Sequence, residues 1–387
     1  MKDILIITSY YPPETGAASN RIYHLAEGLR DRQFKVSVVT PLPNYPTGKV
    51  FKSYRGKFKE TTDEGGVRVH RLWIYASNST NKFLRLLAML SYSLSLLWFF
   101  ISNDLPQTVI VQSPPLLVAF TCCTFLRSKK RRLILNVSDL WPRAGLELGA
   151  LKKNFSYSLL ERMEHSNYKK ADVILGQSEE ILTHVSSLVP NKPMFLYRNF
   201  PDFDAPIPNA VSKPSTKLRM VYAGLLGVAQ GVLKLCQELD YKTVEFHIYG
   251  AGAEREQIEA YLKAHPELPV TYHGELSRDA LHNALLNYDL GIIPLLHRIY
   301  GSVPSKLFEY AKLGLPMLYF GGGEGETLMK DHQLGWVARA GDYNHLNTIL
   351  SELASSDFNA SYKAKIQDTA TRHFDFNTQL DVLAPQL

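Results

Sequence analysis

The sequence has few cysteines and no long apolar run near its start. Three cysteines in 387 residues, two of them adjacent at Cys122 and Cys123, form neither a disulfide framework nor a metal-binding set. The apolar run inside MKDILIITSYY is too short for a signal peptide and lacks a small-residue cleavage site. We therefore expect a protein of a reducing compartment, the cytoplasm.

A strong charge of either sign is also absent. Lys and Arg number 43 against 37 Asp and Glu, a formal net charge of +6. This excess indicates an anionic partner but is too small to predict nucleic-acid binding. No GxGxxG fingerprint occurs, and the GAGAER stretch at Gly250 resembles only its beginning, so a nicotinamide oxidoreductase is not expected.

What the sequence does contain is a repeated series of unbroken apolar runs, typical of parallel strands covered on both faces. At 387 residues, two domains are expected. We predict an α/β protein with a doubly wound domain over 1–200, a linker over 201–216, a second doubly wound domain over 217–370 and a C-terminal segment, 371–387, that returns to the first domain. The expected strands are 4–8, 35–40, 67–73, 108–112, 133–137 and 171–177, then 219–223, 245–249, 270–273, 290–294 and 317–320.

The stretch Gly301–Glu326 carries the clearest chemistry. Ser302 is the expected helix cap and Gly314 the expected helix end. Lys306 and Glu309 are three residues apart, so both project from one face near the helix N-terminus. A cation, a carboxylate and free amides suit a ligand with phosphates and vicinal hydroxyls, although such a pair alone is more often a solvated surface pair.

Two segments have alternative interpretations. Phe83–Ile101 is interpreted as a buried crossover helix, with a membrane-docking interfacial helix as the alternative. The basic cluster of 127–132 fits anionic lipid or a solvated turn equally well. In the linker, Asp202 and Asp204 form an acid-x-acid pair, but they lie among prolines and we expect no metal there.

With two Rossmann-like halves and these motifs, the sequence resembles the GT-B glycosyltransferases, and glycosyltransferase family 4 in particular. The likeness is carried, in family order, by YYPPETG (10–16), VSDLWP (137–142), AGLLGVAQG (223–231), YGAGAE (249–254) and VPSKLFEYAKLGLP (303–316). DLWP with PSKLFEY is most similar to the bacterial surface-polysaccharide branch that adds sugars such as N-acetylfucosamine. The resemblance implies two domains facing each other across a cleft.

The resemblance also implies roles for single residues. Lys306 would contact the donor diphosphate, Glu309 would hold the ribose, and Asp139 would lie on the acceptor side; these three are the catalytic candidates. The donor-binding candidates are Gly16, Gly224, Gly227, Gln230, Gly250, His273 and Glu275. Gly301 replaces the first glutamate of the family's E-x7-E motif, and Leu225 and Gln230 replace the usual Arg and Lys of the phosphate loop.

The implied activity is retaining, metal-independent and cofactor-free transfer of a sugar, hexosyl or acetamidohexosyl, from a nucleotide diphosphate donor, expected to be UDP-linked. The acceptor would be lipid-linked or an oligosaccharide, with peripheral contact to an anionic membrane at its inner face. A sugar-nucleotide 2-epimerase of the same fold and a non-catalytic sugar-nucleotide-binding partner are the alternatives.

Overall fold

The computed structural model describes residues 2–79, 81–206, 217–356 and 358–387. The chain forms two compact units. The first comprises Met1–Asn199, Tyr300–Ser302 and Asn377–Leu387, and the second comprises Phe200–Ile299 and Val303–Phe376. Residues 207–216 of the predicted linker lie outside the described residues.

The first unit contains one sheet in the order β3-β4-β2-β1-β5-β6-β7-β8. Its strand pairs are parallel except for β3, which runs antiparallel to β4 at the edge. The strands are β1 (Asp3–Ile7), β2 (Lys35–Pro41), β3 (Lys59–Glu64), β4 (Val67–Leu72), β5 (Thr108–Ser113), β6 (Arg132–Val137), β7 (Val173–Gly176) and β8 (Met194–Leu196).

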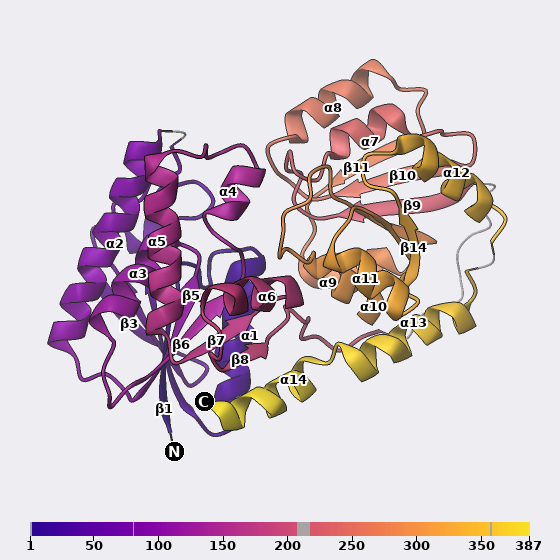
Figure 1. Cartoon of the computed structure of the whole chain (residues 1–387). Helices are drawn as coiled ribbons and strands as arrows, with labels where there is room; N and C mark the ends of the chain where they lie inside the picture. Colours follow the sequence, from indigo (N-terminus) through magenta and orange to yellow (C-terminus); the bar gives the residue numbers. More distant parts are fainter. Residues whose placement is uncertain (1, 80, 207–216, 357) are drawn as a thin grey trace. The chain divides into compact units, whose positions relative to one another are not determined.

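Helices connect these strands, as the parallel sheet requires. They are α1 (Ala17–Asp31), α2 (Lys82–Ser102), α3 (Leu116–Phe125), α4 (Arg143–Glu147), α5 (Phe155–Lys170) and α6 (Glu179–Leu188), with a 3-10 turn, η1, at Lys52–Tyr54. Helix α3 packs against both α2 and α5 (Figure 1). On this face of the sheet Leu5 and Ile7 join Tyr92 and Leu96 of α2 in one buried cluster.

Helix α2 corrects one sequence-based interpretation. It is the crossover between β4 and β5, but it is not a buried helix, because only one of its faces packs on the sheet. Tyr92 and Leu96 are buried, whereas Trp98 is 73% exposed. Within the described residues, Phe83–Ser102 is the one helical stretch long and apolar enough to cross a membrane.

The second unit contains a fully parallel sheet in the order β11-β10-β9-β12-β13-β14. Its strands are β9 (Leu218–Ala223), β10 (Val244–Tyr249), β11 (Val270–Gly274), β12 (Leu290–Pro294), β13 (Met317–Phe320) and β14 (Gly335–Ala338). The helices are α7 (Val232–Glu238), α8 (Arg255–Ala264), α9 (Arg278–Leu285), α10 (Ser305–Lys312), α11 (Glu324–Asp331), α12 (Tyr343–Leu353) and α13 (Ala360–His373). Buried clusters cover both faces of this sheet.

The chain ends with α14 (Phe376–Leu383) and a 3-10 turn, η2, at Ala384–Gln386. All but the first residue of this segment belongs to the first unit. Arg32 binds Asp381 at 2.7 Å, and Gln379 accepts a hydrogen bond from the Arg198 backbone N–H at 2.8 Å. These contacts tie the end of the chain to the first unit.

Candidate functional site

In the second unit, α10 brings Lys306 and Glu309 together. The helix begins at Ser305, with Pro304 at the cap position, so the predicted cap at Ser302 is wrong. Lys306 Nζ lies 2.8 Å from Glu309 Oε2, and His282 Nε2 of α9 lies 2.9 Å from Glu309 Oε1. The Glu309 side chain is 14% exposed and that of His282 is 7% exposed, so this is not a solvated surface pair.

The partners of Glu309 decide its charge. Burial by itself would raise the pKa of this carboxyl group, but the Lys306 ammonium and the hydrogen bonds from His282 and Lys306 outweigh it. The pKa of Glu309 is lowered to about 2. Glu309 is therefore ionised at any physiological pH, and its remaining lone pairs can accept hydrogen bonds from sugar hydroxyls.

The turn after β9 lies directly beneath the Lys306 side chain. A Cβ atom added to Gly224 would be 3.1 Å from Lys306 Cε. Two tyrosines hold the turn in place, since Tyr310 Oη accepts from the Ala223 N–H at 3.0 Å and Tyr222 Oη donates to the Leu225 carbonyl at 2.6 Å. The glycine thus leaves the ammonium of Lys306 next to a fixed backbone turn, an arrangement that suits a phosphate.

Three further donor-side candidates, Gly227, Gln230 and Gly250, lie at the same carboxyl edge of the sheet. Gly250 and Gln230 have packing roles there. A Cβ atom on Gly250, where φ is +128°, would lie 1.8 Å from the Gly224 carbonyl oxygen. Gly250 is therefore needed for the close approach of two turns. The Gln230 side chain lies over Gly227, with Oε1 2.6 Å from the position of a Cβ atom there.

At the edge strand β11, His273 stacks on Tyr249 with ring centroids 4.4 Å apart, and its Nε2 lies 3.0 Å from His247 Nδ1. Burial lowers the pKa of His273, which favours the neutral ring. Glu275 follows in an exposed position. Asp202 and Asp204 flank Phe203, whose ring packs on His282 at 4.2 Å between centroids.

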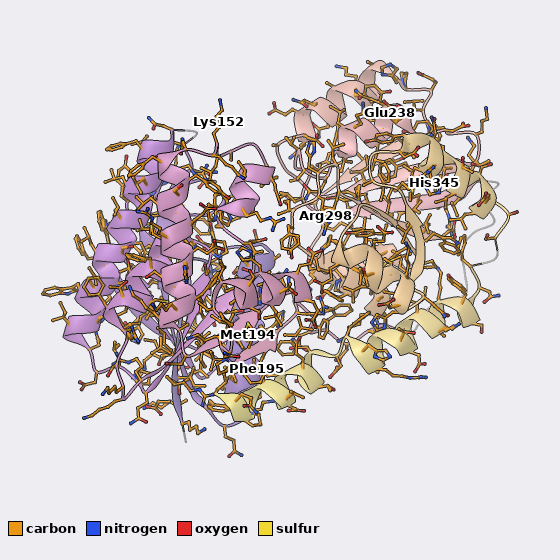
Figure 2. The ribbon with its side chains drawn as sticks, viewed as in Figure 1. Lys152, Met194, Phe195, Glu238, Arg298 and His345 are labelled. Atoms are coloured by element: carbon orange, nitrogen blue, oxygen red, sulfur yellow. The ribbon has the colours of Figure 1, made fainter. Side chains whose placement is uncertain are left out.

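Sequence reasoning missed Arg298, a second cation at this edge. Arg298 belongs to the loop after β12 and lies against the glycine turn after β13, because a Cβ atom on Gly323 would be 2.8 Å from Arg298 Nε. Strand β12 lies between β9 and β13 in the sheet. Lys306 and Arg298 therefore each lie against a glycine turn at the carboxyl ends of strands flanking β12. Figure 2 labels Arg298.

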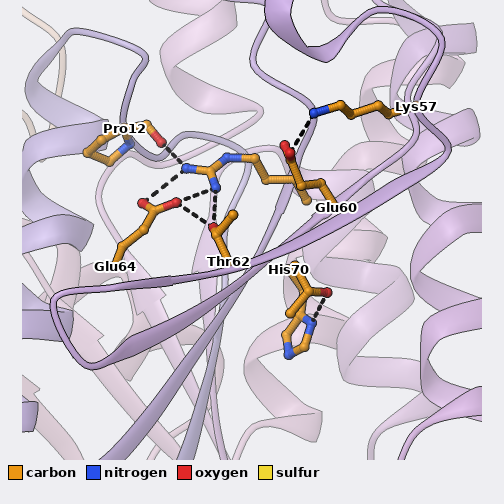
Figure 3. Close-up of polar contacts among 8 residues, drawn as sticks. Pro12, Lys57, Glu60, Thr62, Glu64 and His70 are labelled. Atoms are coloured by element: carbon orange, nitrogen blue, oxygen red, sulfur yellow. Dashed lines mark hydrogen bonds and ion pairs between the residues drawn. The ribbon is translucent and has the colours of Figure 1, made fainter.

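In the first unit, Arg71 fixes the loop 10–16 after β1, although no sequence pattern had singled this residue out. Arg71 of β4 is fully buried, donates to the Pro12 carbonyl at 2.6 Å and binds both carboxylate oxygens of Glu64 (Figure 3). Glu14 accepts from the Asn44 and Tyr45 N–H groups at 2.7 and 2.8 Å. The loop is therefore held rigidly, which prepares it for a ligand.

Gly16 ends this loop and occupies the cap position before α1. Its φ is +139°, and the nearest atom to an added Cβ is the Tyr45 ring at 3.9 Å, so the space above Gly16 is open. This placement suits close approach of an anion to the backbone at the start of α1.

Asp139 follows β6 and does not cap a helix, since Pro142 occupies the cap position of α4. Burial raises its pKa to about 6, and the charge of nearby Arg21 opposes the rise. Arg21 is itself buried and donates to Gln177 at 2.5 Å, to Asn136 at 2.8 Å and to the Tyr197 carbonyl at 3.0 Å. Asp139 thus lies beside a buried, hydrogen-bonded guanidinium and can exchange a proton near neutral pH.

Gly301, which replaces the first glutamate of the motif, belongs to the first unit. Its N–H donates to Glu180 at 2.7 Å and its carbonyl accepts from Ser178 Oγ at 2.7 Å. Its φ is +83°, and an added Cβ would lie 2.9 Å from Ile181 Cγ1. A glutamate in this conformation would therefore be strained and would displace Ile181.

Both halves of the sequence match glycosyltransferase family models. Residues 16–196 match the "Glycosyl transferase 4-like domain" and residues 218–356 match "Glycosyl transferases group 1". With two Rossmann-like units of parallel sheet, the chain belongs to the GT-B glycosyltransferases. No curated protein matches the sequence.

Solved structures share this fold over the whole chain. Sucrose-phosphate synthase from Thermosynechococcus elongatus matches with a TM-score of 0.75 at 12% identity, covering 100% of this chain and 99% of that chain. The Anabaena protein HepE in complex with UDP and glucose matches with a TM-score of 0.67 at 14% identity, covering 100% of both chains. The catalytic domain of starch synthase IV from Arabidopsis thaliana, bound to ADP and acarbose, matches with a TM-score of 0.66 at 11% identity. The match covers 100% of this chain and 99% of that chain.

Proposed function

We propose that this glycosyltransferase moves a sugar from a nucleotide diphosphate donor to a hydroxyl group of a lipid-linked or oligosaccharide acceptor, with retention at the anomeric carbon. The donor is UDP-linked and its sugar is an N-acetylated amino or deoxy hexose. The product is part of a surface polysaccharide. The complexes of HepE with UDP and with UDP-glucose support the donor class.

One observation carries the proposal: Lys306 is held by buried Glu309 directly over the Gly224 turn. The pair is fixed before any ligand arrives, because His282 and Lys306 occupy different oxygens of the Glu309 carboxylate. A preorganised cation stabilises developing charge without the cost of reorganising water. Arg298, against the next glycine turn, supplies the second positive charge that Leu225 and Gln230 do not.

The chemistry follows from these charges. The bond from the anomeric carbon to the diphosphate oxygen breaks, and its electrons remain on the diphosphate. The acceptor hydroxyl then bonds to that carbon on the face that the diphosphate leaves, which retains the configuration, and its proton passes to the departing diphosphate oxygen. Lys306 and Arg298 stabilise this leaving group more strongly in the transition state than in the donor, which is the condition for faster transfer. Glu309 orients the ribose by accepting hydrogen bonds, and it does not attack the sugar.

On the acceptor side, Asp139 positions the attacking hydroxyl group. With a pKa raised to about 6, it is ionised at neutral pH and can accept a hydrogen bond from that hydroxyl. Residues from the protein alone perform these roles in the proposal, without a metal or a cofactor.

The test compares Lys306→Ala with Lys330→Ala. Lys330 forms the same kind of helical pair, with Glu326 at 2.6 Å, but its side chain is 62% exposed. We expect Lys306→Ala to lower kcat/KM for transfer from a UDP-sugar by about a hundredfold. Lys330→Ala should stay within about twofold of wild type. Equal rates for the two variants contradict the proposed role of Lys306.

Product analysis distinguishes the remaining functions. Incubation of the protein with the donor and no acceptor should give no epimerised nucleotide sugar. If an epimerised nucleotide sugar forms, the protein is a 2-epimerase. If the protein binds the donor but transfers no sugar to any of a panel of lipid-linked and oligosaccharide acceptors, it is a non-catalytic binding protein. This alternative is tested because Gly301 replaces the first glutamate of the motif. The anomeric configuration of a transfer product tests retention.

A further inference from the structure

The outward face of α2 is an apolar stripe that runs the length of the helix. Its exposed residues recur every three or four positions, which places them along one side of the helix. They are Phe83 (69% exposed), Leu86 (42%), Leu87 (39%), Leu90 (43%), Leu94 (66%), Trp98 (73%) and Ile101 (82%). At 1.5 Å per residue, the stripe is roughly 27 Å long.

This stripe is not the face with which α2 packs on its own unit. The opposite side of the helix already buries Tyr92, Leu96 and Phe99. A helix on the surface of a soluble protein ordinarily turns polar residues outward. Two further aromatic rings are exposed on this set of helices: Phe125 (62%) at the end of α3, which packs against α2, and Phe155 (82%) at the start of α5, which packs against α3. An apolar surface of this extent marks an interaction site.

Positive charge surrounds the stripe. Between Lys82 and Arg132 the sequence has seven Lys and Arg residues and one acid, Asp104. After Phe125, the chain exposes Arg127, Lys129, Lys130 and, at the start of β6, Arg132. Lys152 and Lys153 are exposed just before Phe155, and Figure 2 shows Lys152 at the surface. Exposed aromatic rings beside cations suit a phospholipid surface, with rings among the acyl chains and ammonium groups on the phosphates.

The same charges argue against a second copy of the chain as the occupant. Two identical faces in a symmetric dimer would bring these cations together, and Asp104 is the one acid between Lys82 and Arg132 that could offset them. An anionic lipid bilayer supplies both the apolar layer and the opposite charge.

We propose that the outward stripe of α2, with Phe125, Phe155 and the flanking cations, docks the protein on a membrane that contains anionic phospholipid. The inference rests on the proposed function, because a lipid-linked acceptor would be met at that surface. Helices α2 and α5 begin at the edge of the sheet where the parallel strands end, which is also the edge that carries Asp139. Docking would therefore bring the N-terminal end of α2, which lies on the acceptor side of the first unit, to the bilayer.

The experiment uses the full chain with Trp73, Trp141 and Trp336 changed to Phe, so that Trp98 is the only fluorophore of its kind. Vesicles of phosphatidylcholine with phosphatidylglycerol should shift Trp98 emission to the blue and sediment the protein. Vesicles of pure phosphatidylcholine should bind it about tenfold more weakly.

The matched variants are Leu94→Ser and Val382→Ser, whose native side chains are 66% and 67% exposed in the same unit. Leu94→Ser should weaken vesicle binding about tenfold, and Val382→Ser less than twofold. Equal binding by the two variants overturns the proposal. So does a concentration-dependent dimer that Leu94→Ser dissociates and that does not bind vesicles.

Transfer by the wild type to a soluble acceptor, measured without vesicles, separates this proposal from the proposed function. Vesicle binding that fails while transfer proceeds refutes the docking surface alone. Transfer that fails while Trp98 reports vesicle binding refutes the proposed acceptor chemistry alone.

Discussion

The Lys306–Glu309 pair makes a quantitative prediction about the stability of the second unit. The pKa of Glu309 falls from 4.5 to about 2, a difference worth about 3 kcal/mol between its two protonation states. Because the folded-state pKa is lowered, this stabilisation is present above pH 4.5 and is lost as the pH falls toward 2. The Lys306 ammonium is the largest of the causes that lower this pKa, so we expect the two side chains to be energetically coupled by about 2 kcal/mol.

A double-mutant cycle measures this coupling. Lys306→Met, Glu309→Gln and the double variant should give a coupling free energy of about 2 kcal/mol at pH 7.5. The same cycle at the exposed pair Lys330–Glu326 should give under about 0.5 kcal/mol. Removing the Lys306 ammonium from the wild type should also cost less at pH 3 than at pH 7.5, since Glu309 then begins to protonate.

Urea unfolding followed by tryptophan fluorescence is the assay. Trp336 is the one tryptophan of the second unit, so Phe in place of Trp73, Trp98 and Trp141 makes the signal specific to that unit. A coupling at Lys306–Glu309 no larger than at Lys330–Glu326 would show that Lys306 does not stabilise the buried Glu309 carboxylate.

Three further predictions concern single positions. Gly250→Ala should destabilise the second unit by at least about 3 kcal/mol in urea unfolding, because its Cβ meets the Gly224 carbonyl; Gly274→Ala, with nothing within 4 Å, should cost about 1 kcal/mol. Asp139→Asn should raise the melting temperature at pH 8 and leave it unchanged below pH 4, since a raised carboxyl pKa costs stability once the group ionises; a gain at low pH contradicts this. Arg71→Met should speed amide hydrogen exchange in the loop 10–16 about tenfold or more, and unchanged exchange would show that the Pro12 contact does not hold the loop.

Most of the parallel strands could be predicted because apolar residues dominate a run of strand length, as in β1 and β5. Strand β3 could not, since Lys59–Glu64 is polar throughout and pairs only at the sheet edge. Strands β8 and β14, with three and four residues, are too short to give a pattern. The start of α10 was misplaced because Ser302 has the chemistry of a cap, whereas the chain stays extended through Pro304.

In the candidate site, the proximity of Lys306 and Glu309 could be predicted because both residues lie on one turn of a helix. The roles of His282 and Arg71 could not be predicted. Their partners, Glu309 and Pro12, are 27 and 59 residues away in the sequence, and no local pattern encodes such a contact. One signal existed for His282: it precedes buried Leu285 by three positions and so shares the inward side of α9. Arg298 had no signal, because only the fold brings it to the turn at Gly323.

In the proposed mechanism, the donor diphosphate binds at the Gly224 turn beneath Lys306. A crystal structure of the protein with UDP bound tests this placement. We expect the diphosphate within hydrogen-bond reach of Lys306 Nζ and of the backbone amides after Gly224, with the ribose hydroxyls on Glu309. A diphosphate bound elsewhere, with the Lys306–Glu309 pair untouched, would contradict it.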